Sequence, residues 1–271
     1  MKKILIFLVI PALVLTGCSK NISRLLVDPK NSSTVPAAAL FTEAEFNLAS
    51  TVSSSNVNLN IFRLITQYWT ETTYFDEANY DLGTRAIPDF WWNAWYTTVL
   101  NNCEQAKKAA PNDIKDAATL KNARAVSDIL EVYAYYNLVN TYGNVPYTQA
   151  ENSDVPFPKY DDAKTLFLDL ISRLDKAIAD LDESAGSWGS ADLVYGGDPA
   201  MWKKFAYTFE LKMAMVLADV DAATAKTVAE AAAPNVFSSN DDNALFAFQG
   251  SPPNTNPIWV DLVQSGRQDF V

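Results

Sequence analysis

Residues 114–147 read IKDAATLKNARAVSDILEVYAYYNLVNTYGNVPY, and this stretch decides the fold class. Its apolar positions recur at helical spacing, with Val126, Ile129, Tyr133 and Tyr136 on one face. Gly143 supplies a C-terminal stop, because glycine adopts the left-handed conformation that ends many helices. The stretch therefore predicts one long helix over residues 114–142.

Further helical patterns lie on both sides of this helix. They cover residues 38–52, 59–72, 88–110, 161–181, 198–216 and 222–233. Asp161 or Asp162 can cap one of them, and Asp198-Pro199 begins another. Long helices joined in pairs by modest loops predict a mainly α fold, an array of tetratricopeptide-like helical hairpins without the strict repeat consensus. Only Ala244–Phe248 alternates like a strand.

The composition excludes several classes of function. The chain has 271 residues with 32 acidic against 21 basic side chains, and such an acidic surface repels nucleic acid. It contains no histidine, which rules out Ser-His-Asp and Cys-His catalysis and any His-ligated zinc or haem in this stretch. We therefore expect no catalytic residues, no metal and no cofactor.

The N-terminus has the pattern of a bacterial lipoprotein signal. A basic start, Met1–Lys3, precedes the apolar run Ile4–Leu15, which is too short to span a membrane as a helix. Small residues then precede Cys18, as lipoprotein signal peptidase requires, so we expect a signal peptide over residues 1–17 and a lipid on the Cys18 thiol. The less favoured alternative is an ordinary signal that ends at a cysteine by chance.

The mature N-terminus then forms a tether. Residues 18–37 are mostly polar with two prolines, and they precede the helical domain expected over residues 38–271. No aspartate follows Cys18, which favours the outer membrane over retention at the inner membrane. With Cys18 lipidated, Cys103 has no disulfide partner and is expected to be a small buried residue on a helix.

Several segments, in order, resemble the SusD-like branch of the SusD/RagB family of nutrient-binding outer-membrane lipoproteins. They are Asp28-Pro29, Gln67–Trp69 with Tyr74–Glu77, Tyr133–Tyr147, Pro158–Asp161 with Leu174–Ile178, and Gly197-Asp198 with Trp202–Ala206. The resemblance implies tetratricopeptide-like hairpins packed against a variable ligand-binding half. It also implies a SusC-like TonB-dependent transporter as partner. Family members are about twice this length, so we expect the chain to be truncated before the ligand-binding half is complete.

Two regions contain candidate ligand-binding residues. Between Tyr74 and Trp95, aromatic side chains alternate with polar ones without clear helical period, and sugar rings stack on flat aromatics while polar groups bond their hydroxyls. Trp92 and Trp95 have the spacing of core residues instead. The candidates are Tyr74, Asp76, Asn79, Tyr80 and Arg85, together with Trp188 and Tyr195. The last two lie in a glycine-rich loop, where they either face solvent as a platform for a ligand or pack under the loop.

These observations favour a lipid-anchored protein of the outer membrane, at the cell surface, that captures oligosaccharide or peptide and passes it to the transporter without catalysis. The alternative is a lipid-anchored all-α glycosidase, which could use acids among Glu71, Asp76, Glu77 and Asp81. A third hypothesis is a periplasm-facing scaffold with protein partners only. The sequence leaves glycan and peptide ligands undistinguished.

Overall fold

Helix α7 (Ala117–Tyr142) lies at the centre of the helical fold. The computed structural model describes residues 34–270, so Cys18, the predicted signal peptide and most of the tether lie outside the described residues. The helix begins three residues later than predicted because Asp116 caps it, accepting a hydrogen bond of 2.8 Å from the Thr119 amide. It ends at Gly143, whose φ of 75° is left-handed, as predicted.

Long helices surround α7, and short ones connect them. The α-helices are α3 (Ala37–Ser53), α4 (Phe62–Ile65), α5 (Ile87–Asn93), α6 (Asn101–Asp113), α8 (Ala163–Asp180), α9 (Pro199–Leu217), α10 (Ala222–Ala232) and α11 (Pro257–Trp259). The π-helical turns η1 (Ala94–Leu100) and η5 (Val260–Gln264) continue α5 and α11, and the 3₁₀ turns are η2 (Gly189–Ala191), η3 (Ala233–Asn235) and η4 (Asn240–Asp242). Strands β1 (Val145–Pro146) and β2 (Tyr160–Asp161) pair antiparallel, with Val145 opposite Asp161.

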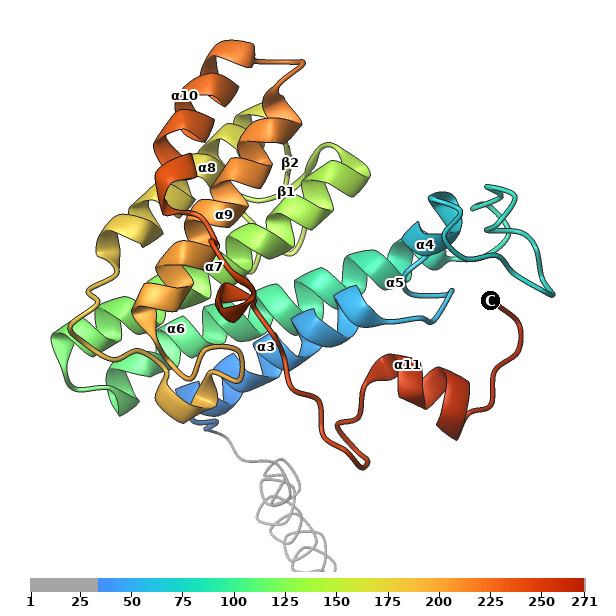
Figure 1. Ribbon diagram of the computed structural model, residues 1–271, viewed down its shortest axis with the longest axis horizontal. Coiled ribbons are helices and arrows are strands. Elements are labelled where there is room, and N and C mark those ends of the chain that lie inside the picture. The colour runs from blue at the N-terminus through green and yellow to red at the C-terminus, as the bar shows by residue number, and fades with distance from the viewer. Residues whose placement is uncertain (1–33, 271) are drawn as a thin grey trace, which may run out of the picture. The chain divides into compact units, whose positions relative to one another are not determined.

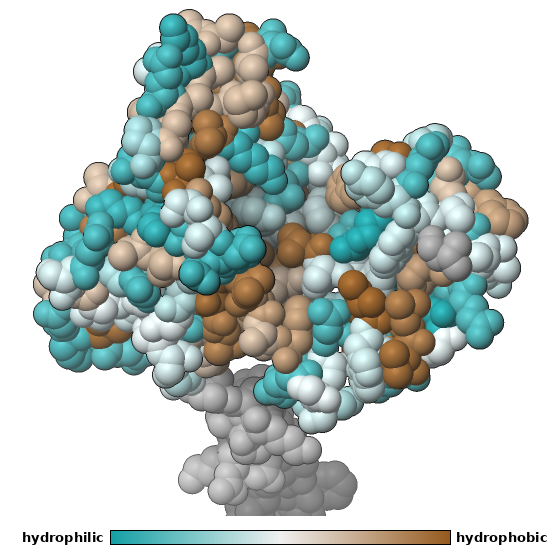
Figure 2. Space-filling model, viewed as in Figure 1, coloured by the Kyte–Doolittle hydropathy of each residue, from teal (hydrophilic) through white to brown (hydrophobic). Residues whose placement is uncertain are grey.

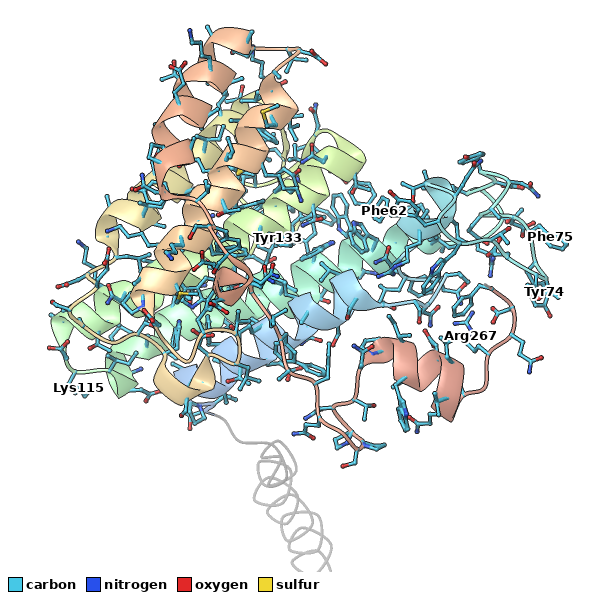
Figure 3. The ribbon with its side chains drawn as sticks, in the orientation of Figure 1. Phe62, Tyr74, Phe75, Lys115, Tyr133 and Arg267 are labelled. Carbon is cyan, nitrogen blue, oxygen red and sulfur yellow. The ribbon has the colours of Figure 1, made fainter. Side chains whose placement is uncertain are left out.

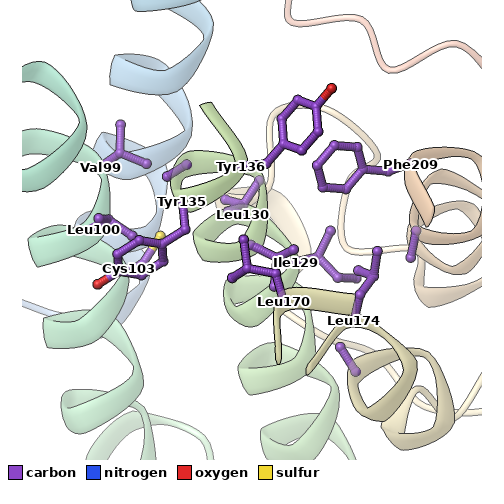
Figure 4. Packing of buried hydrophobic residues seen from close by; sticks show 14 of the residues in the cluster. Val99, Leu100, Cys103, Ile129, Leu130, Tyr135, Tyr136, Leu170, Leu174 and Phe209 are labelled. Atoms are coloured by element: carbon purple, nitrogen blue, oxygen red, sulfur yellow. The ribbon is translucent and has the colours of Figure 1, made fainter. Parts of the chain in front are cut away.

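The helices pack as successive antiparallel neighbours. In Figure 1, α3 runs along the continuous helix formed by α5, η1 and α6, while α8, α9 and α10 follow on the other side of α7. Figure 4 shows side chains of α6, α7, α8 and α9 meeting in one apolar cluster. The predicted mainly α hairpin array is confirmed. Within residues 34–270, no helix is both long and apolar enough to cross a bilayer.

A charged network joins three helices beside this core. Lys107 of α6 lies 3.0 Å from Asp128 and 2.8 Å from Glu131, both on α7. Arg173 of α8 pairs with the same two carboxylates. Burial raises the pKa of Glu131, while the two cations oppose this effect. Each charge in the network therefore has partners of opposite sign, which offset the cost of burying it between α6, α7 and α8.

Cys103 is fully buried and unpaired on α6, as predicted.

Two predicted elements differ from the structure. Ala244–Phe248 is extended, but it has no strand beside it within residues 34–270; Phe246 and Phe248 pack instead on Phe46 of α3. The predicted helix over residues 59–72 is reduced to α4. It stops because Gln67 adopts a left-handed φ of 59°, which no helix interior accommodates.

Candidate ligand-binding loop

Residues 67–85, here called the aromatic loop, carry a group of exposed aromatic side chains. Tyr74 is 75% exposed, and Tyr68, Phe75 and Tyr80 are also more than half exposed. Figure 3 shows Tyr74 and Phe75 at the outer edge of the fold, pointing away from the helices. Exposed rings grouped on one segment are unusual for a soluble surface and typical of a binding site.

The backbone of this loop is held in a costly conformation. Gln67, Tyr74 and Tyr80 have φ values of 59°, 57° and 64°, in the left-handed region that side chains other than glycine rarely adopt. Each such residue costs about 1–3 kcal/mol and persists only where surrounding contacts enforce it. Strain of this kind clusters at functional sites, which supports the loop as the candidate site.

A buried ion cluster enforces the loop conformation from below. Glu77 is fully buried and pairs with Arg85, whose guanidinium also lies 3.8 Å from Glu71 and donates to the Asn58 side chain at 3.0 Å. The Ala78 amide donates to Glu71 at 3.1 Å. Burial raises the pKa of Glu71. The charges therefore anchor both ends of the exposed segment.

A second anchor comes from the far end of the described chain. The Thr72 amide donates to the Asp269 carbonyl at 2.9 Å, and the Glu71 backbone pairs with that of Phe270 in an isolated antiparallel bridge. Figure 3 places Arg267 close to this part of the loop, and its side chain bonds Asp269 at 2.9 Å. The loop is thus fixed at its base while its aromatic tip stays open.

The predicted residues of this region divide into two groups. Tyr74, Asn79 and Tyr80 are exposed and free to meet a ligand, and the Tyr80 hydroxyl is fixed by the Gln67 side-chain amide at 3.1 Å. Asp76 accepts a bond of 3.1 Å from the Thr84 hydroxyl and is half-buried, as is Arg85. Asp76 and Arg85 therefore shape the loop more than they face solvent.

Trp188 packs under its loop and does not face solvent, so it is wrong as a ligand-binding candidate. Trp188 is 6% exposed; it stacks on Phe41 with ring centroids 4.7 Å apart and donates its indole N–H to the Ala123 carbonyl at 2.8 Å. Tyr195 is half-buried, and its hydroxyl donates to the Asp242 carbonyl at 2.8 Å. The structure does not bring these two residues to the aromatic loop; they pack the helices instead.

Tyr68 and Phe75 are exposed loop residues outside the predicted set. Phe75 lies within the aperiodic stretch that indicates exposure, so its signal was present in the sequence. Tyr68 falls in the predicted helix over residues 59–72. It is exposed because α4 ends at Ile65, well before the predicted end of that helix. A cavity of about 290 Å³ opens beside Tyr68, lined also by Gln67, Trp69 and Thr70.

The acids considered for glycoside hydrolysis are not arranged for it. Glu71 and Glu77 are buried against Arg85, Asp76 bonds Thr84, and the Asp81 side chain accepts from the Gly83 amide at 3.0 Å. A glycosidase needs one carboxyl to donate a proton and a second to act on the anomeric carbon, both in contact with the sugar. These acids are occupied in holding the loop.

An apolar cavity of about 290 Å³ lies elsewhere, between α3, α9 and the segment after η4. Its mainly apolar lining includes Leu48, Val52, Trp202, Phe205 and Phe246. Figure 2 shows apolar residues gathered near the centre of the viewed face. This lining offers few groups for sugar hydroxyls, so the aromatic loop is the better candidate for a polar ligand.

The helical scaffold presents a group of exposed aromatic side chains on a loop whose base is anchored. The chain belongs to the SusD-like family described as "Starch-binding associating with outer membrane", whose model matches residues 29–271. A search of the curated proteins gave no match.

Solved structures share the fold. A chitin-binding protein is 29% identical, with a TM-score of 0.66 over 78% of this chain and 45% of that chain. A SusD/RagB family protein from Bacteroides thetaiotaomicron is 22% identical, with a TM-score of 0.72 over 88% of this chain and 50% of that one. A chitin-binding SusD homologue from Flavobacterium johnsoniae is 23% identical, with a TM-score of 0.66 over 85% and 49%. The chain spans about half the length of these proteins.

Proposed function

We propose that this protein captures oligosaccharides at the outer-membrane surface and passes them to a SusC-like TonB-dependent transporter, without making or breaking a bond. The observation that carries the proposal is the group of exposed rings, Tyr68, Tyr74, Phe75 and Tyr80, on a loop whose base is fixed. A pre-formed platform binds with little loss of conformational entropy.

The chemistry of the loop suits a sugar. Pyranose rings present flat C–H faces that stack on exposed aromatics, and the Asn79 side chain is exposed and can bond hydroxyls. A peptide would call for a free arginine or carboxylate to hold its ends, and Arg85 is already paired with Glu77. The family description and the chitin-binding relative at 29% identity support a glycan, with chitin oligosaccharides the first to test.

The remaining parts of the proposal rest on the sequence and on the family. Lipidation at Cys18 would attach the protein to the membrane, since the three acyl chains of a mature bacterial lipoprotein hold firmly where one does not. The absence of catalysis is supported by the burial of Glu71 and Glu77 against Arg85. The transporter partner is proposed from the resemblance to the SusD-like family.

Calorimetric titration of the full chain with N-acetylated chitin oligosaccharides and with starch oligosaccharides tests the binding role. We expect one of these neutral glycans to bind, and the Tyr74→Ala/Phe75→Ala double variant to lose at least tenfold in affinity. Each ring contact contributes about 0.5–1.5 kcal/mol, and a tenfold change corresponds to about 1.4 kcal/mol. Met215→Ala, which removes an exposed side chain from α9, is the matched control and should bind normally.

Two further outcomes separate the competing hypotheses. Release of shorter sugars during a prolonged incubation would show glycosidase activity and contradict a role limited to binding. Isolation of the lipidated protein from outer membranes in mild detergent should recover a large TonB-dependent barrel in near-equal amount. Recovery of soluble or inner-membrane partners instead would favour the scaffold.

A further inference from the structure

Two adjoining cavities lie along the connection between β1 and β2. The first, of about 520 Å³, is lined by Trp92, Tyr96, Pro146, Ala150, Glu151, Pro156, Phe157, Pro158 and Tyr160. The second, of about 660 Å³, is lined by Asn101, Glu104, Gln105, Lys108 and residues 150–154. They share Ala150 and Glu151, so an extended ligand can occupy both. No residue of the aromatic loop lines either one.

The first cavity has an aromatic wall. Trp92 and Tyr160 are nearly parallel, with ring centroids 6.1 Å apart and planes at 29°. Tyr160 is largely exposed and Phe157 is 91% exposed, although both are large apolar rings. The Tyr96 hydroxyl already donates to the Pro146 carbonyl at 2.6 Å, so this wall offers ring faces to a ligand. Such faces suit a pyranose ring or a cation.

Glu151 lies where the two cavities meet. Its φ of 54° is left-handed, a strained conformation for glutamate. The structure records no hydrogen bond or ion pair for its half-buried carboxylate within residues 34–270. A strained residue that directs an unpaired carboxylate to a cavity is poorly explained by folding alone.

The surroundings of Glu151 are negative. Burial raises the pKa of this carboxyl to about 7, and Glu131 and Glu104 raise it further in the same direction, while Lys108 opposes them. Lys107 is already engaged by Asp128 and Glu131. A bound cation would relieve this repulsion, whereas a neutral ligand would leave it in place.

We infer that these cavities form a second glycan site, which takes a saccharide carrying a protonated amino group. The pyranose ring lies on Phe157, Tyr160 and Trp92, and the ammonium meets Glu151, while the adjoining cavity receives the next unit. The inference rests on the proposed function for the assignment of a glycan as ligand. It differs from that function in site and in ligand charge. A lysine side chain of a partner protein would match the same carboxylate but would leave the long aromatic wall and the second cavity unfilled.

The probes are a tetramer of glucosamine and its N-acetylated counterpart, in which acetyl groups convert the charged amines into neutral amides. The Tyr74→Ala/Phe75→Ala variant removes the rings of the aromatic loop and isolates the second site. We expect this variant to retain binding of the glucosamine tetramer and to bind the N-acetylated tetramer at least tenfold more weakly.

Two single variants then test the site itself. Glu151→Gln removes the charge and keeps the shape, and it should weaken the glucosamine tetramer about tenfold while leaving the neutral tetramer unaffected at the aromatic loop. Phe157→Ala removes a ring that is almost wholly exposed, so the fold should survive, and binding should weaken similarly.

Equal affinity of Glu151→Gln and the unaltered protein for the glucosamine tetramer would overturn the inference. So would equal binding of both tetramers to the Tyr74→Ala/Phe75→Ala variant, which would make the cavities a neutral-sugar site. A different result would contradict the proposed function: neither the neutral tetramer nor the starch oligosaccharides would bind the unaltered protein.

Discussion

The ring of Phe270 lies flat on the indole of Trp69, with centroids 5.3 Å apart and planes at 11°. Phe270 forms a small apolar cluster with Val57 and Leu64, separate from the main core. Its backbone also pairs with that of Glu71. The segment after η5 therefore closes the base of the aromatic loop, and the order of the loop depends on contacts made very late in the chain.

Phe270→Ala should loosen the loop while leaving the helical core intact. Loss of a buried phenylalanine costs about 3–5 kcal/mol in a well-packed core, and this small cluster should lose less, about 2–3 kcal/mol of local opening free energy. Hydrogen exchange of the Thr72 amide, which donates to Asp269, should accelerate, with weaker neutral-glycan binding alongside. Exchange that stays as slow as in the unaltered protein would show that the ion cluster alone holds the loop.

Arg85→Met should destabilise the loop more than removal of the whole cluster. It leaves Glu71 and Glu77 buried without a cation, and breaking a buried pair in this way costs about 3–5 kcal/mol, at the lower end here because Arg85 is 33% exposed. Denaturant unfolding measures the loss.

The matched comparison is the triple variant Glu71→Gln/Glu77→Gln/Arg85→Met, which removes all three charges. It should recover most of the stability, since an apolar or neutral replacement of a buried ion cluster is often tolerated. If the triple variant is no more stable than Arg85→Met, the loss of stability comes from lost packing of the aliphatic part of the Arg85 side chain and not from unpaired charges.

The helices were predictable because their signals are local. Asp162 accepts from Thr165 at 2.9 Å and Asp198 accepts from Ala200 at 2.8 Å, each in the capping role that its sequence context indicates. Gly143 ends α7 for the same kind of reason. The mainly α class followed from such signals, whereas the family resemblance rested on the order of short segments such as Gln67–Trp69 and Tyr133–Tyr147.

The fate of side chains in loops was not predictable in the same way. Trp188 is buried because Phe41 of α3 and the Ala123 carbonyl of α7 meet it from distant parts of the sequence. Arg85 forms ion pairs with the glutamates at positions 71 and 77, and the spacing of these residues in the sequence does not reveal this pairing. Tyr74 and Tyr80 were found because an aperiodic stretch has no helical face in which to bury them.

Glu45 should make the protein less stable as pH rises. It is 1% exposed on α3, and burial together with the neighbouring Asp192 raises its pKa to about 9, from 4.5 for an ordinary glutamate. Between these values the folded protein keeps a proton that the unfolded chain releases, so the free energy of unfolding falls as pH increases. The loss reaches about 3–4 kcal/mol near pH 7.5 and levels off above pH 9.

Glu45→Gln removes this titration while keeping an acceptor for the Leu193 amide, which donates to Glu45 at 2.6 Å. Urea unfolding at pH 5 and pH 8 should show a smaller decrease in stability for this variant than for the unaltered protein. Glu43→Gln, an exposed change on the same helix, should follow the unaltered protein at both pH values. Identical pH slopes for Glu45→Gln and the unaltered protein would contradict a buried, protonated Glu45.

Thiol counting tests the burial of Cys103 and the lipidation of Cys18 together. Cys103 is fully buried, and burial raises the pKa of its thiol, so a thiol reagent should find no reactive group in the native membrane-extracted protein. In denaturant, one thiol should react if Cys18 carries its lipid as a thioether, and two if it does not. Cys103→Ala should then leave none. If the native protein is labelled rapidly and Cys103→Ala abolishes the labelling, α6 opens readily. If the labelling persists in Cys103→Ala, Cys18 has a free thiol and the basis for the lipid anchor is removed.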